Sequence, residues 1–63
     1  MSETPDEFFR ERDFELRFTT DEGFVWADLI RRETGFVVAK YGRGSDEESA
    51  AARAVERWRQ EQG

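Results

Sequence analysis

The side chains that most often carry out catalysis are missing from this chain. It contains no Cys, no His and no Asn, which excludes thiol nucleophiles, imidazole bases and the usual zinc ligands. Ser45 and Ser49 have no neighbouring base that could activate a hydroxyl. We therefore expect a protein that is not an enzyme, with no catalytic residues and no cofactor.

The acidic run from Asp46 to Glu48 offers the oxygen ligands that Ca²⁺ and Mg²⁺ prefer. Successive residues of a helix diverge by about 100°, so three helical carboxylates in a row cannot converge on one ion. Ser45 followed by this run also fits a capping box, in which the carboxylates complement the positive end of the helix dipole. We expect a helix start here, with Ser45 as its cap, and no metal site.

The segment from Lys40 to Gly44 places two glycines around Arg43, just before the expected helix. Backbone N–H groups and a guanidinium in such a place can bind a phosphate. The carboxylates from Asp46 to Glu48 would repel that anion, and the fuller spacing of a phosphate-binding loop is absent. We interpret the segment as a connector between a strand and a helix.

Length and charge limit the candidates further. Sixty-three residues form one domain, and a net charge of −5 disfavours non-specific phosphate binding. Residues 1–23 carry 8 acids and 3 bases, residues 24–44 carry 2 and 4, and residues 45–63 carry 5 and 3. Only the middle segment is positive. The absence of Cys favours the cytoplasm, and no apolar run approaches the roughly 20 residues of a membrane span.

The apolar pattern predicts an α+β fold, a three-stranded antiparallel meander followed by one helix (βββα). Residues 1–11 form a tail or a short helix with a capping box at Thr4, and residues 12–63 form the single domain. Alternation predicts strands over 12–20, 24–32 and 36–43, joined by three-residue turns that end in glycine. A helix follows from residue 45 to between 60 and 62. Its buried stripe consists of Ala51, Ala54, Val55 and Trp58.

The two turns determine which residues share a face of the sheet. If the first turn has three residues, Thr20 pairs with Phe24. One face then carries Asp28 and Lys40, opposed across two strands, and the apolar residues Phe14, Leu16, Phe18, Trp26, Ile30, Phe36 and Val38. Asp28 and Lys40 either pair with each other at the edge of the helix or, if the strand register differs by one residue, lie in solvent. The other face carries Asp13, Glu15 and Arg17 beside Val25, Ala27, Leu29, Val37, Ala39 and Tyr41.

This second face needs a cover, and large exposed apolar patches commonly mark association surfaces. The cover is an N-terminal helix carrying Phe8 and Phe9, a second copy of the chain, or a different protein. We expect a small accessory or protein-interaction module, homodimeric if a second copy is the partner, that contacts neither membrane nor metal. The expected interaction surface consists of Val25, Leu29, Val37 and Tyr41, with Arg31 and Arg43 as a charged rim.

Nucleic-acid binding is the alternative. The runs Val25–Arg31, Gly35–Tyr41 and Glu48–Ala54 resemble in outline the plant AP2-type DNA-binding domain and integrase amino-terminal domains. The resemblance implies a sheet that reads the major groove of DNA, although the first strand departs from that pattern with Asp13 and Glu15. The contacts would be Arg17, Arg31, Arg32, Lys40 and Arg43, with Tyr41 stacking on a base.

Overall fold

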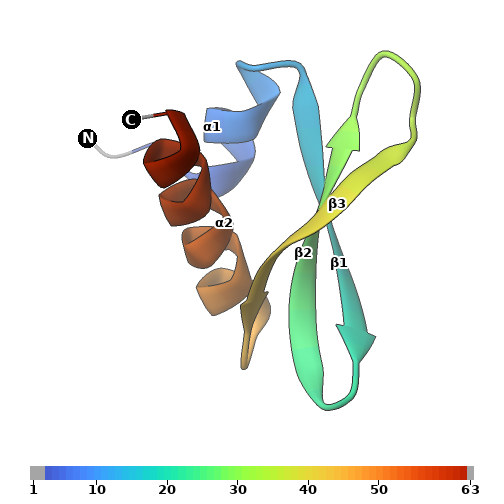
Figure 1. Cartoon of the computed structure of the whole chain (residues 1–63), viewed down its shortest axis with the longest axis vertical. Helices are drawn as coiled ribbons and strands as arrows, with labels where there is room; N and C mark the ends of the chain where they lie inside the picture. The colour runs from blue at the N-terminus through green and yellow to red at the C-terminus, as the bar shows by residue number, and fades with distance from the viewer. Residues whose placement is uncertain (1–2, 63) are drawn as a thin grey trace.

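The computed structural model describes residues 3–62 and confirms the α+β fold. Along the chain the elements are α1 (Pro5–Arg10), β1 (Phe14–Asp21), β2 (Phe24–Arg31), β3 (Val37–Gly44) and α2 (Glu47–Gln62). The strands form an antiparallel meander in the order β1-β2-β3. Both helices lie on one side of this sheet (Figure 1), so the domain has two layers. Within the described residues, neither helix is long and apolar enough to cross a membrane.

Helix α1 begins as its sequence predicts. The side chain of Thr4 accepts a hydrogen bond from the Glu7 N–H at 3.2 Å, and Pro5 occupies the first turn, where its missing N–H is not needed. Phe8 and Phe9 are buried in the same core that α2 covers. The N-terminal helix therefore packs beside α2 and does not cover the opposite face of the sheet.

Helix α2 begins one residue later than predicted. Asp46, not Ser45, caps it, because the Asp46 Oδ1 accepts a hydrogen bond from the Ser49 N–H at 2.7 Å. That hydrogen bond favours the ionised carboxylate and lowers the pKa of Asp46. Of the predicted stripe of α2, Ala51 and Ala54 are buried, whereas Val55 and Trp58 are only partly buried against the core. Ala50 is buried in addition, and these small residues allow the helix to approach the sheet closely.

Two glycines of β3 meet these alanines. A Cβ on Gly42 would collide with the Ala50 carbonyl oxygen and lie 2.7 Å from the Ala54 nitrogen. A Cβ on Gly44 would lie 2.7 Å from the Ala50 nitrogen. Backbone atoms cannot move aside as a flexible side chain can. The seam between α2 and β3 therefore requires glycine on the strand and small residues on the helix.

The expected register of the first hairpin is wrong by one residue. The turn contains two residues, Glu22 and Gly23, both with positive φ (54° and 81°), and Asp21 pairs with Phe24. Positive φ at both central residues is the geometry of a type I′ turn, whose twist matches that of the strands. Because side chains alternate between faces, a slip of one residue turns β2 over relative to β1.

The second hairpin agrees with the prediction only in its middle. Asp28 lies opposite Lys40 as expected, but Ile30 lies opposite Val37 instead of Val38. Register shifts between Ala27 and Asp28 and between Leu29 and Ile30 mark two irregularities in the ladder. The turn is also longer than three residues, since strand pairing stops at residue 31 and resumes at residue 37.

These registers change the composition of both faces. The helices cover Phe14, Leu16, Phe18, Val25, Ala27, Leu29, Ala39 and Tyr41. The aromatic rings around Phe9 pack edge to face, with ring centroids 5.8 Å from Trp58 and 6.2 Å from Tyr41. The predicted core face, which combined the first-strand residues with Trp26 and Ile30, is therefore wrong. Those two side chains lie on the side of the sheet away from the helices.

We predict that Gly42→Ala lowers the free energy of unfolding by at least about 2 kcal/mol, since the methyl group overpacks a backbone seam. Urea unfolding monitored by tryptophan fluorescence measures the change. In the Gly42→Ala background, Ala54→Gly does not restore stability, because the closest contacts involve backbone atoms. Full stability of the single variant would show that the seam is looser than described.

We predict that Glu22→Asn raises the free energy of unfolding by about 1 kcal/mol, because asparagine tolerates the left-handed region that glutamate avoids. The matched control is Glu22→Gln, which also removes the charge but gains nothing in this backbone conformation. Equal stability of the two variants in thermal unfolding would contradict a type I′ turn.

Candidate functional site

The face of the sheet away from the helices forms three rows of directly opposed residues. Since such residues point to the same side of an antiparallel sheet, their side chains are neighbours. We call this surface, together with Phe24 at its end, the open face. Its rows are Thr19, Trp26 and Arg43, then Arg17, Asp28 and Lys40, then Glu15, Ile30 and Val37.

Long cationic side chains lie over the aromatic rings of the open face. The guanidinium carbon of Arg43 is 4.6 Å from the ring centroid of Phe24 and 5.7 Å from that of Trp26. The Nζ atom of Lys40 is 5.4 Å from the Trp26 ring. Such contacts contribute about 0.5 to 1 kcal/mol each at exposed positions. Phe24 is 43% exposed, although it borders a hollow that α2 also lines with Ser49 and Arg53. Trp26 is half-buried, and the cationic side chains lie over its ring.

Asp28 is the buried acid of the open face, with 5% of its surface exposed. Its Oδ2 accepts a hydrogen bond from the Thr19 hydroxyl at 3.1 Å. Its Oδ1 is buried without a hydrogen-bond partner among the described residues, as is the Nε1 of Trp26, two residues away on the same face. Lys40 lies opposite Asp28, but within residues 3–62 the two form no ion pair. Arg17 forms an ion pair with Glu15, with 3.7 Å between its Nη2 and the Glu15 Oε2.

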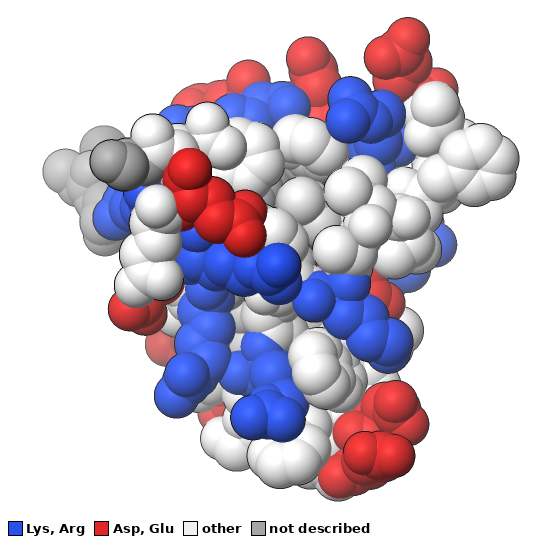
Figure 2. All heavy atoms as spheres, viewed as in Figure 1, with Lys and Arg blue, Asp and Glu red and all other residues white. Residues whose placement is uncertain are grey.

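The third-strand side of the β2–β3 hairpin end exposes apolar side chains, next to the charged residues Arg32 and Glu33 of the turn. Phe36 is 75% exposed, and Val37 and Val38 also expose about half of their surface. This end projects beyond the helices at the upper right of Figure 1, and Figure 2 shows uncharged atoms there next to Lys, Arg, Asp and Glu atoms. Further Lys and Arg atoms gather in the centre and lower part of Figure 2. The hairpin end thus extends the open face with an apolar tip.

The predicted interaction surface does not form one exposed patch. Leu29 and Tyr41 are only 2% and 8% exposed beneath the helices, and Val25 is half-buried against the same core. Val37 and Arg43 do lie on the open face. The physical reason is the one-residue slip of the first hairpin, which moves the odd-numbered residues of β2 to the helix side.

The predicted nucleic-acid contacts are also divided between the two sides. Arg17, Lys40 and Arg43 share the open face. Arg31 lies over the Phe14 ring on the helix side, with its guanidinium carbon 5.3 Å from the centroid. Tyr41 donates a hydrogen bond to Glu61 of α2, so its ring is not available to stack on a base.

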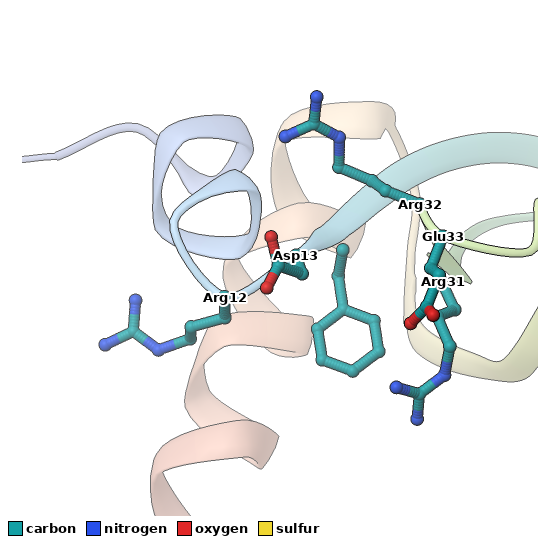
Figure 3. Close-up of a pocket in the computed structure, with 6 residues that line it drawn as sticks. Arg12, Asp13, Arg31, Arg32 and Glu33 are labelled. Carbon is teal, nitrogen blue, oxygen red and sulfur yellow. The ribbon is translucent and has the colours of Figure 1, made fainter.

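A hollow of about 550 Å³ lies where the connection from α1 to β1 meets the β2–β3 turn. Its residues include three arginines, but Figure 3 shows the guanidinium groups of Arg12, Arg31 and Arg32 pointing in different directions. Arg12 is already engaged, since it donates a hydrogen bond to the Phe8 carbonyl at 2.7 Å. Asp13 and Glu33 add negative charge to the rim. The hollow therefore lacks the converging cations of an anion site.

Tyr41 connects β3 to the end of α2. Its hydroxyl donates a hydrogen bond to Glu61, and Arg57 holds the same carboxylate from the next turn at 3.0 Å. Burial, together with the hydrogen bond to Glu61, raises the pKa of Tyr41 to about 12. The Tyr41 hydroxyl in turn lowers the pKa of Glu61. This cluster is structural, because it joins the helix to the sheet inside the domain.

Sequence reasoning missed Phe24 and Trp26 as site residues. Phe24 was placed only at the start of a strand, and Trp26 was assigned to the core because the assumed register put it under the helix. The available signal was the dipeptide Glu22-Gly23 between two strands. A glycine at the second turn position permits a two-residue hairpin, and the register that follows exposes both aromatic residues.

No protein-family model matches the chain, and neither a curated protein nor a solved structure matches it. The open face is therefore interpreted from its own geometry. It combines aromatic rings, three cations and a buried acid on one side of a rigid sheet. An arrangement of this kind can bind a partner by apolar contact and by charge.

We predict that ionisation of Tyr41 destabilises the fold. Its pKa is raised from 10 to about 12, so the stabilisation is fully present below pH 10 and is lost as the pH rises toward 12. Tyr41 is the only tyrosine in the chain, so near-ultraviolet tyrosinate absorbance follows this group alone. Tyr41→Phe removes this part of the pH dependence of unfolding. Titration near pH 10 in the folded wild type would contradict the buried hydrogen bond.

Proposed function

We propose that this protein is a small protein-interaction module that binds a partner polypeptide on the open face of its sheet. One observation carries the proposal: both helices cover the same face, which leaves Phe24 and the hairpin tip exposed and Trp26 only half-buried on the other side. Aromatic residues and arginine are enriched at the centres of protein interfaces. Here both types occur together on the uncovered side.

Charge favours a different protein over a second copy of this chain. On the open face Arg17 is paired with Glu15, Asp28 is buried, and Asp21 lies at the end beside Phe24. The cations near Trp26 that form no ion pair within residues 3–62 are therefore Lys40 and Arg43. Two such faces packed together would bring like charges into contact, which is unfavourable. A partner with acidic side chains beside apolar ones complements the cations and the tip. The preferred partner is therefore an acidic and apolar segment of another protein.

Single-stranded nucleic acid is the second candidate. Arg43 lies over both Phe24 and Trp26, and stacking platforms for bases combine aromatic rings with cations in this way. Asp21 and Glu22, at the turn next to Phe24, oppose a phosphate backbone, as does the net charge of −5. We therefore rank this candidate below a protein partner.

The proposal is tested by selecting a random phage-displayed peptide library on the immobilised protein. We expect enrichment of peptides that combine acidic and apolar residues. Lys40→Glu and Arg43→Glu each weaken binding of the enriched synthetic peptides at least about tenfold, a change of about 1.4 kcal/mol. Isothermal titration calorimetry measures the affinities.

The matched control is Arg10→Glu, which makes the same charge change on α1, on the helix side of the domain. Equal weakening by Arg10→Glu would show that binding follows net charge and not the open face. A stable dimer in sedimentation at micromolar concentration would show that the open face binds a second copy of this chain and not a different protein. Tight binding of a single-stranded oligonucleotide at low salt would favour the second candidate instead.

A further inference from the structure

The open face contains an unpaired donor and an unpaired acceptor on residues two apart along β2. The Nε1 of Trp26 and the Oδ1 of Asp28 are both buried, and neither has a hydrogen-bond partner among residues 3–62. Most buried polar atoms in folded proteins are paired, and leaving one unpaired is destabilising. Two such atoms two residues apart on the same side of one strand leave hydrogen-bonding capacity that a bound ligand can use.

The two atoms specify complementary chemistry. The indole N–H can only donate a hydrogen bond, and a carboxylate oxygen without a proton accepts one. A ligand that satisfies both must therefore present an acceptor and an N–H donor. A planar amide has this arrangement, with a carbonyl oxygen for Trp26 and an N–H for Asp28. A trans peptide unit carries the two groups on opposite edges and can lie between the two atoms, whereas the side-chain amide of asparagine or glutamine carries them on the same edge.

The surrounding residues fit a site that opens to admit the amide. The Thr19 hydroxyl holds the other oxygen of Asp28 at 3.1 Å, which fixes the carboxylate on the sheet. Lys40 and Arg43 contact the Trp26 ring through long side chains that belong to exposed residues. These cations can swing away from the ring without any change in the backbone. A bound amide would then lie in the centre of the open face, between the strands that flank β2.

We propose that Trp26 and Asp28 form an amide-recognition site, which binds a peptide unit or carboxamide of the partner through one donated and one accepted hydrogen bond. This inference rests on the proposed function and names the group of the partner that the open face reads. The hydrogen bonds give the site its chemical preference, and Lys40 and Arg43 add the preference for neighbouring acidic residues.

The test is an NMR titration of the ¹⁵N-labelled full chain with N-methylacetamide. We expect a saturable shift of the Trp26 indole N–H that exceeds the shift of the Trp58 indole, which serves as an internal control. The matched ligand N,N-dimethylacetamide keeps the carbonyl but lacks the N–H. It should bind roughly tenfold more weakly, since a hydrogen bond to a charged group is lost.

Two variants assign the effect to the proposed atoms. Asp28→Val removes the acceptor and abolishes the preference for N-methylacetamide, whereas Trp26→Phe keeps a ring but removes the donor. Asp28→Val should also raise the thermal midpoint of the free protein, by about 4 °C or more, because an unpaired buried group is removed. A falling midpoint, together with strong coupling between Asp28 and Lys40 in a double-mutant cycle, would show that Asp28 is paired within the domain and would overturn the inference.

The outcomes separate this inference from the proposed function. If the selected peptides bind Asp28→Val and Trp26→Phe with unchanged affinity, the proposed interaction module stands and the amide-recognition site is contradicted. Equal shifts from the two acetamides would do the same. Cytidine 5′-monophosphate is the third ligand, because its base also presents a donor beside an acceptor. Binding of this nucleotide without binding of N-methylacetamide would identify a nucleobase as the occupant and overturn the inference.

Discussion

The two-residue turn at Glu22 and Gly23 is the constraint on which the rest of the structure depends. Both residues have positive φ, and the resulting register pairs Asp21 with Phe24. From this pairing it follows that Leu16 lies beside Leu29 under the helices, whereas Trp26 lies on the other side. With one more residue in the turn, β2 would present its opposite side chains to the helices, and the open face would lose its tryptophan.

The helices complete the asymmetry between the two faces. Gly42 and Gly44 allow the backbone of α2 to lie directly against β3, and α1 fills the adjacent space with Phe8 and Phe9. Both helices of residues 3–62 therefore lie on one side, although the fully buried side chain of Ile30 lies on the other. The other side keeps its aromatic rings partly shielded by cations, which links the packing of the core to the proposed binding surface.

The sequence predicted the elements well, because their signals are local. The cap at Thr4, the alternation through β1 and the small-residue stripe of α2 each depend on neighbours within a few positions. The composition of the faces could not be predicted in the same way. It depends on the turn length at Gly23 and on the irregularities in the β2–β3 ladder, where one residue decides the orientation of a whole strand. Asp28 was correctly placed opposite Lys40, but its unpaired oxygen is visible only in three dimensions.

The register of the first hairpin can be measured directly by nuclear Overhauser effects in solution. In an antiparallel pair, Hα atoms approach most closely where directly opposed residues do not exchange backbone hydrogen bonds. The Arg32 N–H donates to the Asp13 carbonyl at 3.1 Å, so odd-numbered residues of β1 bond to β2 and even-numbered ones form the close pairs. The account predicts a strong Hα–Hα effect between Leu16 and Leu29. A strong effect between Leu16 and Asp28 in its place would contradict it, and would return Trp26 to the helix side.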